Sequence, residues 1–153
     1  MGYLSTKRYG HEQGLSCCFR QWRADHSHCR FLHGYALAVR LEFEARQLDD
    51  RNWVVDFGGL KSFKQTLQDM FDHKTVIAED DPQLEWFREG ERRGLLELVV
   101  VPHVGCEQFA KLVFDLANAW LDEQNLNNRC RINKVEVSEH GANSAIYKAS
   151  SLN

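Results

Sequence analysis

The densest group of chemically competent side chains lies between residues 25 and 33. The run Asp25-His26-Ser27-His28-Cys29 is followed by His33, so three of the seven histidines lie close to a cysteine. Imidazole and thiolate are good zinc ligands, and His26 and His28 point the same way if this segment is extended. The spacing matches no standard structural zinc motif, so a polar surface loop without a bound metal explains the cluster equally well.

Cys29 is a second candidate on its own account. It stands between His28 and Arg30, and nearby positive charge favours the reactive thiolate form of a cysteine. The alternative is an inert, half-exposed thiol.

Asp72-His73 and Glu139 are the remaining acid–base candidates. A carboxylate that orients an imidazole, which then activates a thiol, forms a proton relay. Neighbours in sequence do not face each other on a regular helix, so a relay requires that the helix ends at Asp72-His73. The alternative is that His73 only interacts with the helix dipole.

Glu139 ends an apolar strand pattern and could accept two parallel N–H bonds from a guanidine-like ring edge. The alternative for Glu139 is a solvent-exposed strand end.

The elements that must position these residues predict an α+β fold. Strands are expected over residues 14–22, 35–45, 95–101 and 131–139, with Ile146-Tyr147 extending the last, and helices over residues 57–71, 82–92 and 107–124. The apolar–polar alternation in 35–45 is typical of a half-buried strand. Asp56 suits the N-cap of the first long helix. Two strands, then helices, then two strands predict a four-stranded antiparallel sheet with two long helices on one face. Its exposed edges favour a homo-oligomer.

Length and composition narrow the class of protein. The 153 residues fit a single domain over residues 1–153. The formal net charge of −3 provides no basic surface for nucleic acid. No apolar run reaches transmembrane length, so no membrane partner is expected. The five cysteines are odd in number and form no CxxC pair, which favours the reducing cytoplasm.

Five motifs follow one another in an order that resembles the 6-pyruvoyl and 6-carboxy-tetrahydropterin synthases, which share the tunnelling fold. The motifs are Cys29-x-x-Leu32-His33-Gly34 before the alternating strand, Val54-Val55-Asp56-Phe57 with Leu60-Lys61 at the first long helix, Asp72-His73 at its end, Glu107 and Ala110 opening the second helix, and Val135–Glu139. The resemblance covers about residues 14 to 148.

The resemblance implies a ββααββ fold whose sheets join around a trimeric barrel, with trimers that often pair into hexamers. It implies a pterin-acting lyase that converts 7,8-dihydroneopterin triphosphate or a related dihydropterin. One branch of the family forms 6-pyruvoyl-tetrahydropterin, and the bacterial branch forms 6-carboxy-tetrahydropterin on the way to deazaguanine nucleosides such as queuosine. Cys29 would transfer protons, supported by Asp72 and His73. Glu139 would bind the pterin ring, together with Cys106 and Glu107 at the start of the second helix.

The expected zinc ligands differ from the family pattern. The family binds zinc through one histidine on the first strand and His-Gly-His on the second, whereas this chain has His33-Gly34-Tyr35 and either Cys18 or Phe19 at the first-strand position. Cys18, His26 or His28 together with His33 would be the replacement ligands. The second hypothesis for the function is a metal-independent or non-catalytic protein that binds a pterin or purine-like ring.

Overall fold

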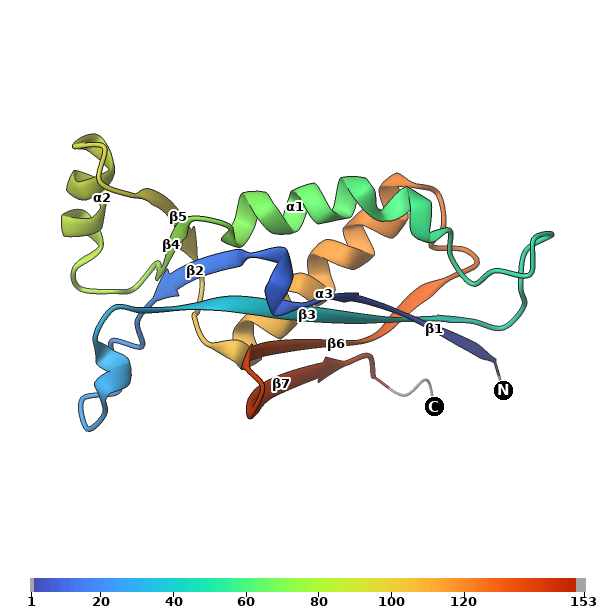
Figure 1. Cartoon of the computed structure of the whole chain (residues 1–153), viewed down its shortest axis with the longest axis horizontal. Coiled ribbons are helices and arrows are strands. Elements are labelled where there is room, and N and C mark those ends of the chain that lie inside the picture. Colours follow the sequence, from blue (N-terminus) through green and yellow to red (C-terminus); the bar gives the residue numbers. More distant parts are fainter. Residues whose placement is uncertain (1, 151–153) are drawn as a thin grey trace.

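The computed structural model describes residues 2–150, which form three α-helices and a seven-stranded sheet (Figure 1). The strands are β1 (Tyr3–Tyr9), β2 (Leu15–Phe19), β3 (His33–Ala45), β4 (Lys74–Ala78), β5 (Glu97–Val101), β6 (Arg131–His140) and β7 (Asn143–Lys148). The helices are α1 (Lys61–Phe71), α2 (Leu84–Arg92) and α3 (Cys106–Glu123), with 3-10 turns η1 (His11–Gln13), η2 (His28–Arg30) and η3 (Phe57–Leu60). The predicted α+β class is confirmed.

The long strand β3 organises the sheet. One of its edges has two antiparallel partners in succession, β2 opposite residues 33–37 and β1 opposite residues 39–45. Its other edge pairs antiparallel with β6. Residues 10–14, which include η1, leave the sheet between the two partners, so the sheet is interrupted beside the middle of β3.

The prediction of four antiparallel strands was wrong in number and direction. The sheet order is β5-β4-β2-β3-β6-β7, with β1 also on β3, and β4 runs parallel to both β2 and β5. Four of the five residues of β4 are buried, so this strand lacks the alternation that marks a half-exposed strand. β1 was missed because most of its residues are exposed.

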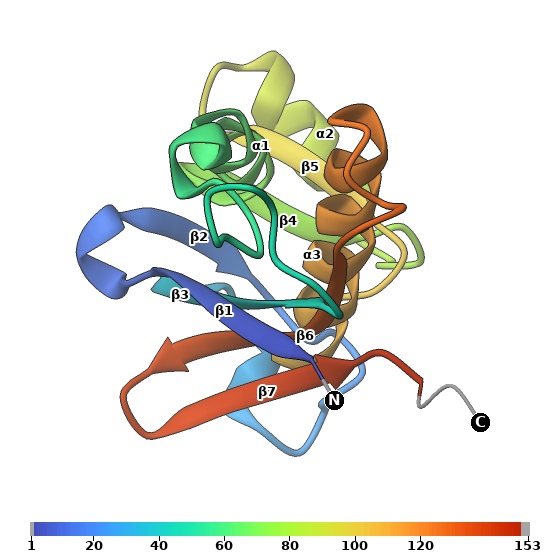
Figure 2. The ribbon, with the colours of Figure 1, turned by 90° about the vertical axis from the view of Figure 1, so that its right-hand side faces the viewer.

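Both long helices lie on one side of the sheet (Figure 2). α1 packs against β2 and β4, and α3 packs against β6 and β7. Between them the aromatic rings of Phe63, Phe71 and Phe109 are fully buried. The first helix was predicted to begin at residue 57, but residues 57–60 form η3, where Asp56 Oδ1 accepts the Gly58 amide at 2.8 Å.

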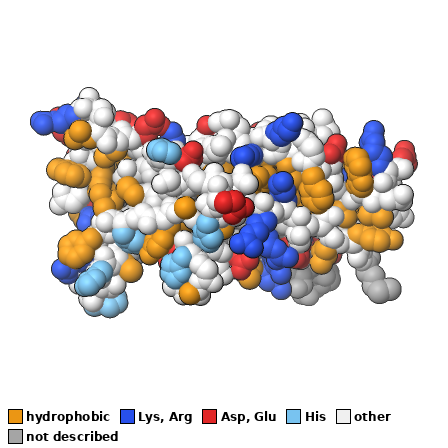
Figure 3. All heavy atoms as spheres, in the orientation of Figure 1, with side chains coloured by type: hydrophobic (Ala, Val, Ile, Leu, Met, Phe, Trp, Pro, Cys, Tyr) orange, Lys and Arg blue, Asp and Glu red, His pale blue; other side chains and the backbone are white. Residues whose placement is uncertain are grey.

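No helix covers the opposite face of β1, β3, β6 and β7 within the described residues (Figure 2). Lys and Arg side chains gather where β1 meets β3, with histidines beside them (Figure 3).

Within residues 2–150, no helix combines the length and apolar character needed to cross a membrane.

Candidate functional site

Glu139 lies at an irregularity near the end of β6. Its neighbour Ser138 pairs with Ser144 and His140 pairs with Asn143, so the register of the β6–β7 hairpin shifts at Glu139. Such a bulge turns a side chain away from the direction that regular alternation would give it. Glu139 is half-buried, which leaves its carboxylate accessible to a ligand.

Cys106 lies against this carboxylate at the start of α3. The thiol is 7% exposed, and burial raises its pKa to about 12, with further increases from the charge and hydrogen bond of Glu139 and from Glu107. A thiol with this pKa stays protonated at neutral pH and therefore acts as a donor rather than as a nucleophile. Glu107 is exposed in the first turn of α3, where its charge also suits the helix dipole.

Tyr35 links the two sides of the site. Burial raises the pKa of its phenol, and the charges of Glu139, Cys29 and Cys106 raise it further. The raised pKa of Tyr35 thus connects this phenol electrostatically with Cys29, Cys106 and Glu139. Three of these four residues were predicted as site residues, while the role of Tyr35 had been left open.

Cys29 is exposed in η2, on the loop between β2 and β3. Its amide donates to Ser27 Oγ at 3.2 Å, and its carbonyl accepts the Gln21 amide at 2.8 Å. The loop is therefore fastened to the chain that leaves β2, which fixes the backbone position of the thiol.

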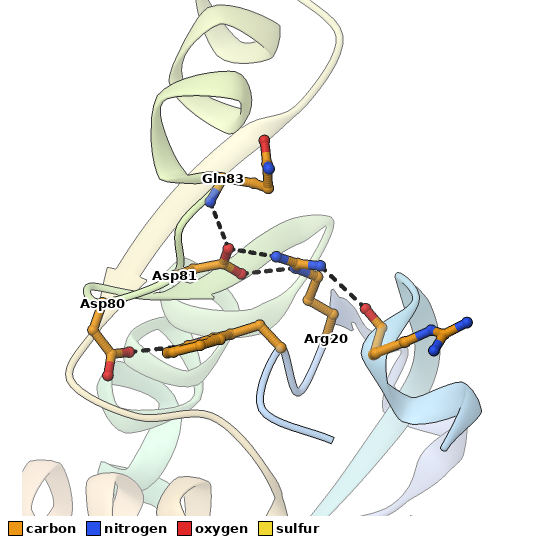
Figure 4. Close-up of polar contacts among 6 residues, drawn as sticks. Arg20, Asp80, Asp81 and Gln83 are labelled. Atoms are coloured by element: carbon orange, nitrogen blue, oxygen red, sulfur yellow. Dashed lines mark hydrogen bonds and ion pairs between the residues drawn. The ribbon is translucent and has the colours of Figure 1, made fainter. Parts of the chain in front are cut away.

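A bidentate ion pair holds the same loop to the segment before α2 (Figure 4). Arg20 donates from Nε and Nη2 to the two carboxylate oxygens of Asp81 at 2.8 and 2.6 Å, and from Nη1 to the Arg30 carbonyl at 3.3 Å. Asp81 also accepts the Gln83 amide at 2.8 Å, and its side chain is 1% exposed. Arg20 thus connects a buried carboxylate to the backbone next to Cys29. Sequence reasoning missed this pair, because the two residues lie 61 positions apart in the chain.

Asp72 and His73 form the predicted contact at the end of α1. Helix α1 ends at Phe71, and Asp72 Oδ1 lies 2.8 Å from His73 Nδ1. His73 adopts a left-handed backbone conformation with φ of 58°, and its amide donates to the Ser16 carbonyl at 2.6 Å. A non-glycine residue in this region is strained, which is common at functional sites.

Within residues 2–150, no hydrogen bond joins this pair to Cys29. His73 is anchored at Ser16, at the start of β2, whereas Cys29 is anchored at Gln21, beyond its end. A relay among Cys29, Asp72 and His73 inside one chain therefore stays a prediction.

Three aromatic side chains cluster where β2 ends and β3 begins. The ring of Phe19 lies 5.0 Å from that of His33 and 6.2 Å from that of Tyr35, and His33 and Tyr35 lie 5.5 Å apart, edge to face. Phe19 and His33 are also paired Cα partners in the sheet. Cys18 pairs with Gly34 on the other face, where its thiol lies 3.4 Å from Thr75 Oγ1.

Comparison with known proteins gives the family. The model of the 6-pyruvoyl tetrahydropterin synthase family matches residues 10–150. The chain belongs to this family. It is 25% identical over 122 residues to a 6-carboxy-5,6,7,8-tetrahydropterin synthase from Aquifex aeolicus, which covers 78% of this chain and 75% of the relative. It is 30% identical over 57 residues to one from Rickettsia bellii, which covers 37% of this chain and 41% of that protein.

Solved structures share the fold of this family member. An uncharacterized protein from Wolinella succinogenes superposes with a TM-score of 0.78 at 23% identity, over 98% of this chain and 99% of that one. A 6-pyruvoyl tetrahydropterin synthase from Plasmodium falciparum gives a TM-score of 0.67 at 18% identity, over 94% and 96% of the two chains. The predicted family is thus confirmed, and it supports a pterin-processing, tetrahydropterin synthase-like enzyme.

The donors of this family member do not fit the expected zinc site. Phe19, not Cys18, faces His33 and Tyr35, and a phenyl ring offers no ligand atom. Cys18 lies on the opposite face, and His28 stacks near Phe31 with ring centroids 6.5 Å apart. Among residues 2–150, no three His, Cys, Asp or Glu side chains are grouped to hold a metal ion. The predicted ligands His33, Cys18 and His28 are therefore not brought together.

Proposed function

We propose that this chain is a tetrahydropterin synthase that acts on 7,8-dihydroneopterin triphosphate or a related dihydropterin. The observation that carries the proposal is the half-buried Glu139 at the irregularity of β6, whose charge raises the pKa of both Cys106 and Tyr35. The names of the curated relatives, both 6-carboxy-5,6,7,8-tetrahydropterin synthases, support the carboxy branch of the family.

Glu139 would bind and orient the ring. The amino group and ring N–H of a pterin form a flat pair of donors, and a carboxylate accepts such a pair through two parallel bonds. Glu139 is half-buried, so its carboxylate stays accessible to such a pair. Charge-assisted bonds of this kind fix orientation as well as affinity.

Cys29 would then move protons on the side chain of the bound ring. It is exposed, unlike Cys106, and the loop contacts of Ser27 and Gln21 fix its backbone. The partner that accepts or returns the proton would be His73, oriented by Asp72 at 2.8 Å. No hydrogen bond joins Cys29 to His73 within residues 2–150, so we place the relay between Cys29 of one copy and His73 of another. The free edges of β5 and β7 support such a homo-oligomer, and the five free cysteines support a reducing cytoplasm.

Ring-binding calorimetry with neopterin tests the proposal. Replacing Glu139 by Gln removes the charge and one acceptor, so the affinity should fall roughly tenfold or more. Glu123→Gln, at the far end of α3, is the matched control and should bind as wild type. The Cys29→Ala variant should keep the ring affinity and lose turnover of 7,8-dihydroneopterin triphosphate. A Cys29→Ala variant with full turnover would exclude the relay.

A second function, metal-independent ring binding without the lyase step, is favoured by one observation. Phe19 and Tyr35 occupy the face of His33 where zinc ligands were expected. Metal analysis of protein purified without chelator, combined with turnover assays in added zinc, separates the two. Ring binding without zinc and without turnover would support the second function and contradict the enzyme.

A further inference from the structure

A pocket of about 220 Å³ opens on the uncovered face of the sheet, apart from the ring-binding residues. It exists because the partner of β3 is interrupted at residues 10–14, while the β6–β7 turn closes the other side. Side chains from β1, η1, β3 and β6 line it, including Arg8, His11, Arg40, Glu136, Ser138 and His140.

Two arginines lie side by side in the lining of this pocket. Arg8 and Arg40 are paired Cα partners on β1 and β3, and like charges directly opposite each other destabilise a sheet. Among the described residues, neither guanidinium forms an ion pair with a carboxylate. Glu136, the partner of Arg40 on β6, instead accepts the hydroxyl of Ser144 at 2.9 Å.

The neighbouring rows of the same strands show that this arrangement is unusual here. Arg131 binds Glu44 at 2.6 Å, and Lys134 lies 3.5 Å from Glu42. Each of these cations therefore faces an acid from the adjacent strand. Lys134 also faces a second cation, Lys148, but Lys134 has Glu42 beside it. Arg8 and Arg40 both lack an ion pair among the described residues, which favours an anion supplied by a ligand.

The other groups in the pocket are suited to an oxyanion. The His11 ring is anchored through Nδ1 to the Ala36 carbonyl, which leaves its second nitrogen without a bond among the described residues. The Ser138 hydroxyl is available on the same wall. Guanidinium, imidazole and hydroxyl groups are the donors that bind phosphate oxygens.

We infer that the Arg8–Arg40 pocket binds a phosphate chain, namely the triphosphate of the pterin substrate. The pocket adjoins the ring site, because Ser138 and His140 flank Glu139 in sequence and the His140 ring lies 6.0 Å from that of Tyr35. A ring held by Glu139 can therefore extend its phosphates into the pocket. The assignment to that substrate rests on the proposed function; the anion site itself rests on the two arginines.

Inorganic tripolyphosphate is the probe for this site. Calorimetry should show saturable binding to the wild type, and Arg8→Gln or Arg40→Gln should each weaken it roughly tenfold or more. Arg88→Gln, on exposed α2, is the control and should bind as wild type. Without ligand, both pocket variants should melt at or above the wild-type temperature, because like-charge repulsion is removed. A loss of tripolyphosphate binding in these variants then cannot be attributed to unfolding of the protein. Equal affinities in all four proteins, or no saturable binding, would overturn the inference.

Neopterin, which lacks phosphates, separates this inference from the proposed function. The arginine variants should keep wild-type affinity for neopterin while they lose tripolyphosphate. If tripolyphosphate binds through the two arginines but neopterin does not bind, the anion site stands and the proposed function fails. If neopterin binds through Glu139 but Arg8→Gln and Arg40→Gln leave the affinity for tripolyphosphate unchanged, the proposed function stands and the anion site is wrong.

Discussion

Replacing Asp81 by Asn should loosen the loop that carries Cys29. The carboxylate of Asp81 receives two bonds from Arg20 at 2.8 and 2.6 Å, and Arg20 in turn reaches the Arg30 carbonyl next to Cys29 (Figure 4). The Asn side chain has almost the same shape but carries no charge and has one acceptor fewer. The change therefore tests the ion pair with little change in packing.

The expected loss of stability follows from burial. Breaking a buried ion pair by removing one partner costs about 3–5 kcal/mol. The Asp81 side chain is 1% exposed but that of Arg20 is 19% exposed, so water compensates part of the loss. We expect the free energy of unfolding to fall by about 2–3 kcal/mol, which lowers Tm by about 5–10 °C in a domain of this size.

The neighbouring residue supplies a matched control. Asp80 pairs with Arg23 at 3.1 Å, but their side chains are 43% and 68% exposed. Asp80→Asn should leave stability unchanged, because exposed pairs are weak. Urea denaturation measures both variants, and hydrogen exchange of the Gln21 amide, which donates to the Cys29 carbonyl, reports the loop directly. Equal stability and equal Gln21 protection in the two variants would refute the reasoning.

The same pair predicts a dependence on pH. Burial opposes the charge of Asp81, but the bonds from Arg20 and the Gln83 amide outweigh it and hold its pKa below the usual value of 3.8. A carboxyl with a lowered folded pKa binds fewer protons when folded, so its contribution is full above that usual value and is lost as pH falls through the folded pKa. The stability gap between wild type and Asp81→Asn should therefore be constant near neutral pH and narrow below about pH 4.

Two further predictions concern the cysteines and the aromatic cluster. Iodoacetamide at pH 8 should alkylate exposed Cys29 and spare Cys106, because burial raises the pKa of Cys106 to about 12. Mass spectrometry of the digested peptides measures which cysteine is labelled. Rapid labelling of Cys106 would contradict its buried, protonated state. The double substitution Phe19→His with Tyr35→His adds two imidazoles to that of His33 on one face of the sheet. This variant should retain zinc after dialysis, whereas wild type should not. Equal metal content in the two proteins would show that the aromatic cluster is not what excludes zinc.

The predicted helices and strands agree with the structure where the sequence has a clear apolar–polar period. The alternation of residues 35–45 predicted most of β3, and the spacing of apolar residues in 107–124 predicted α3 within one residue at each end. These patterns are visible because each element buries one face. β4 was missed because it is buried almost throughout, so its sequence carries no period.

The sequence by itself determined the family and the α+β class, and it named Cys29, Asp72, His73 and Glu139 as candidates, because motif order and side-chain type are properties of the chain. Only the tertiary structure decided how these residues are grouped. It aligned Phe19 rather than Cys18 with His33, since a shift of one residue in a strand moves a side chain to the other face. It also anchored His73 to Ser16 and Cys29 to Gln21, and it joined Arg20 to Asp81. Such contacts depend on strand register and on pairing between distant segments, which no local pattern encodes.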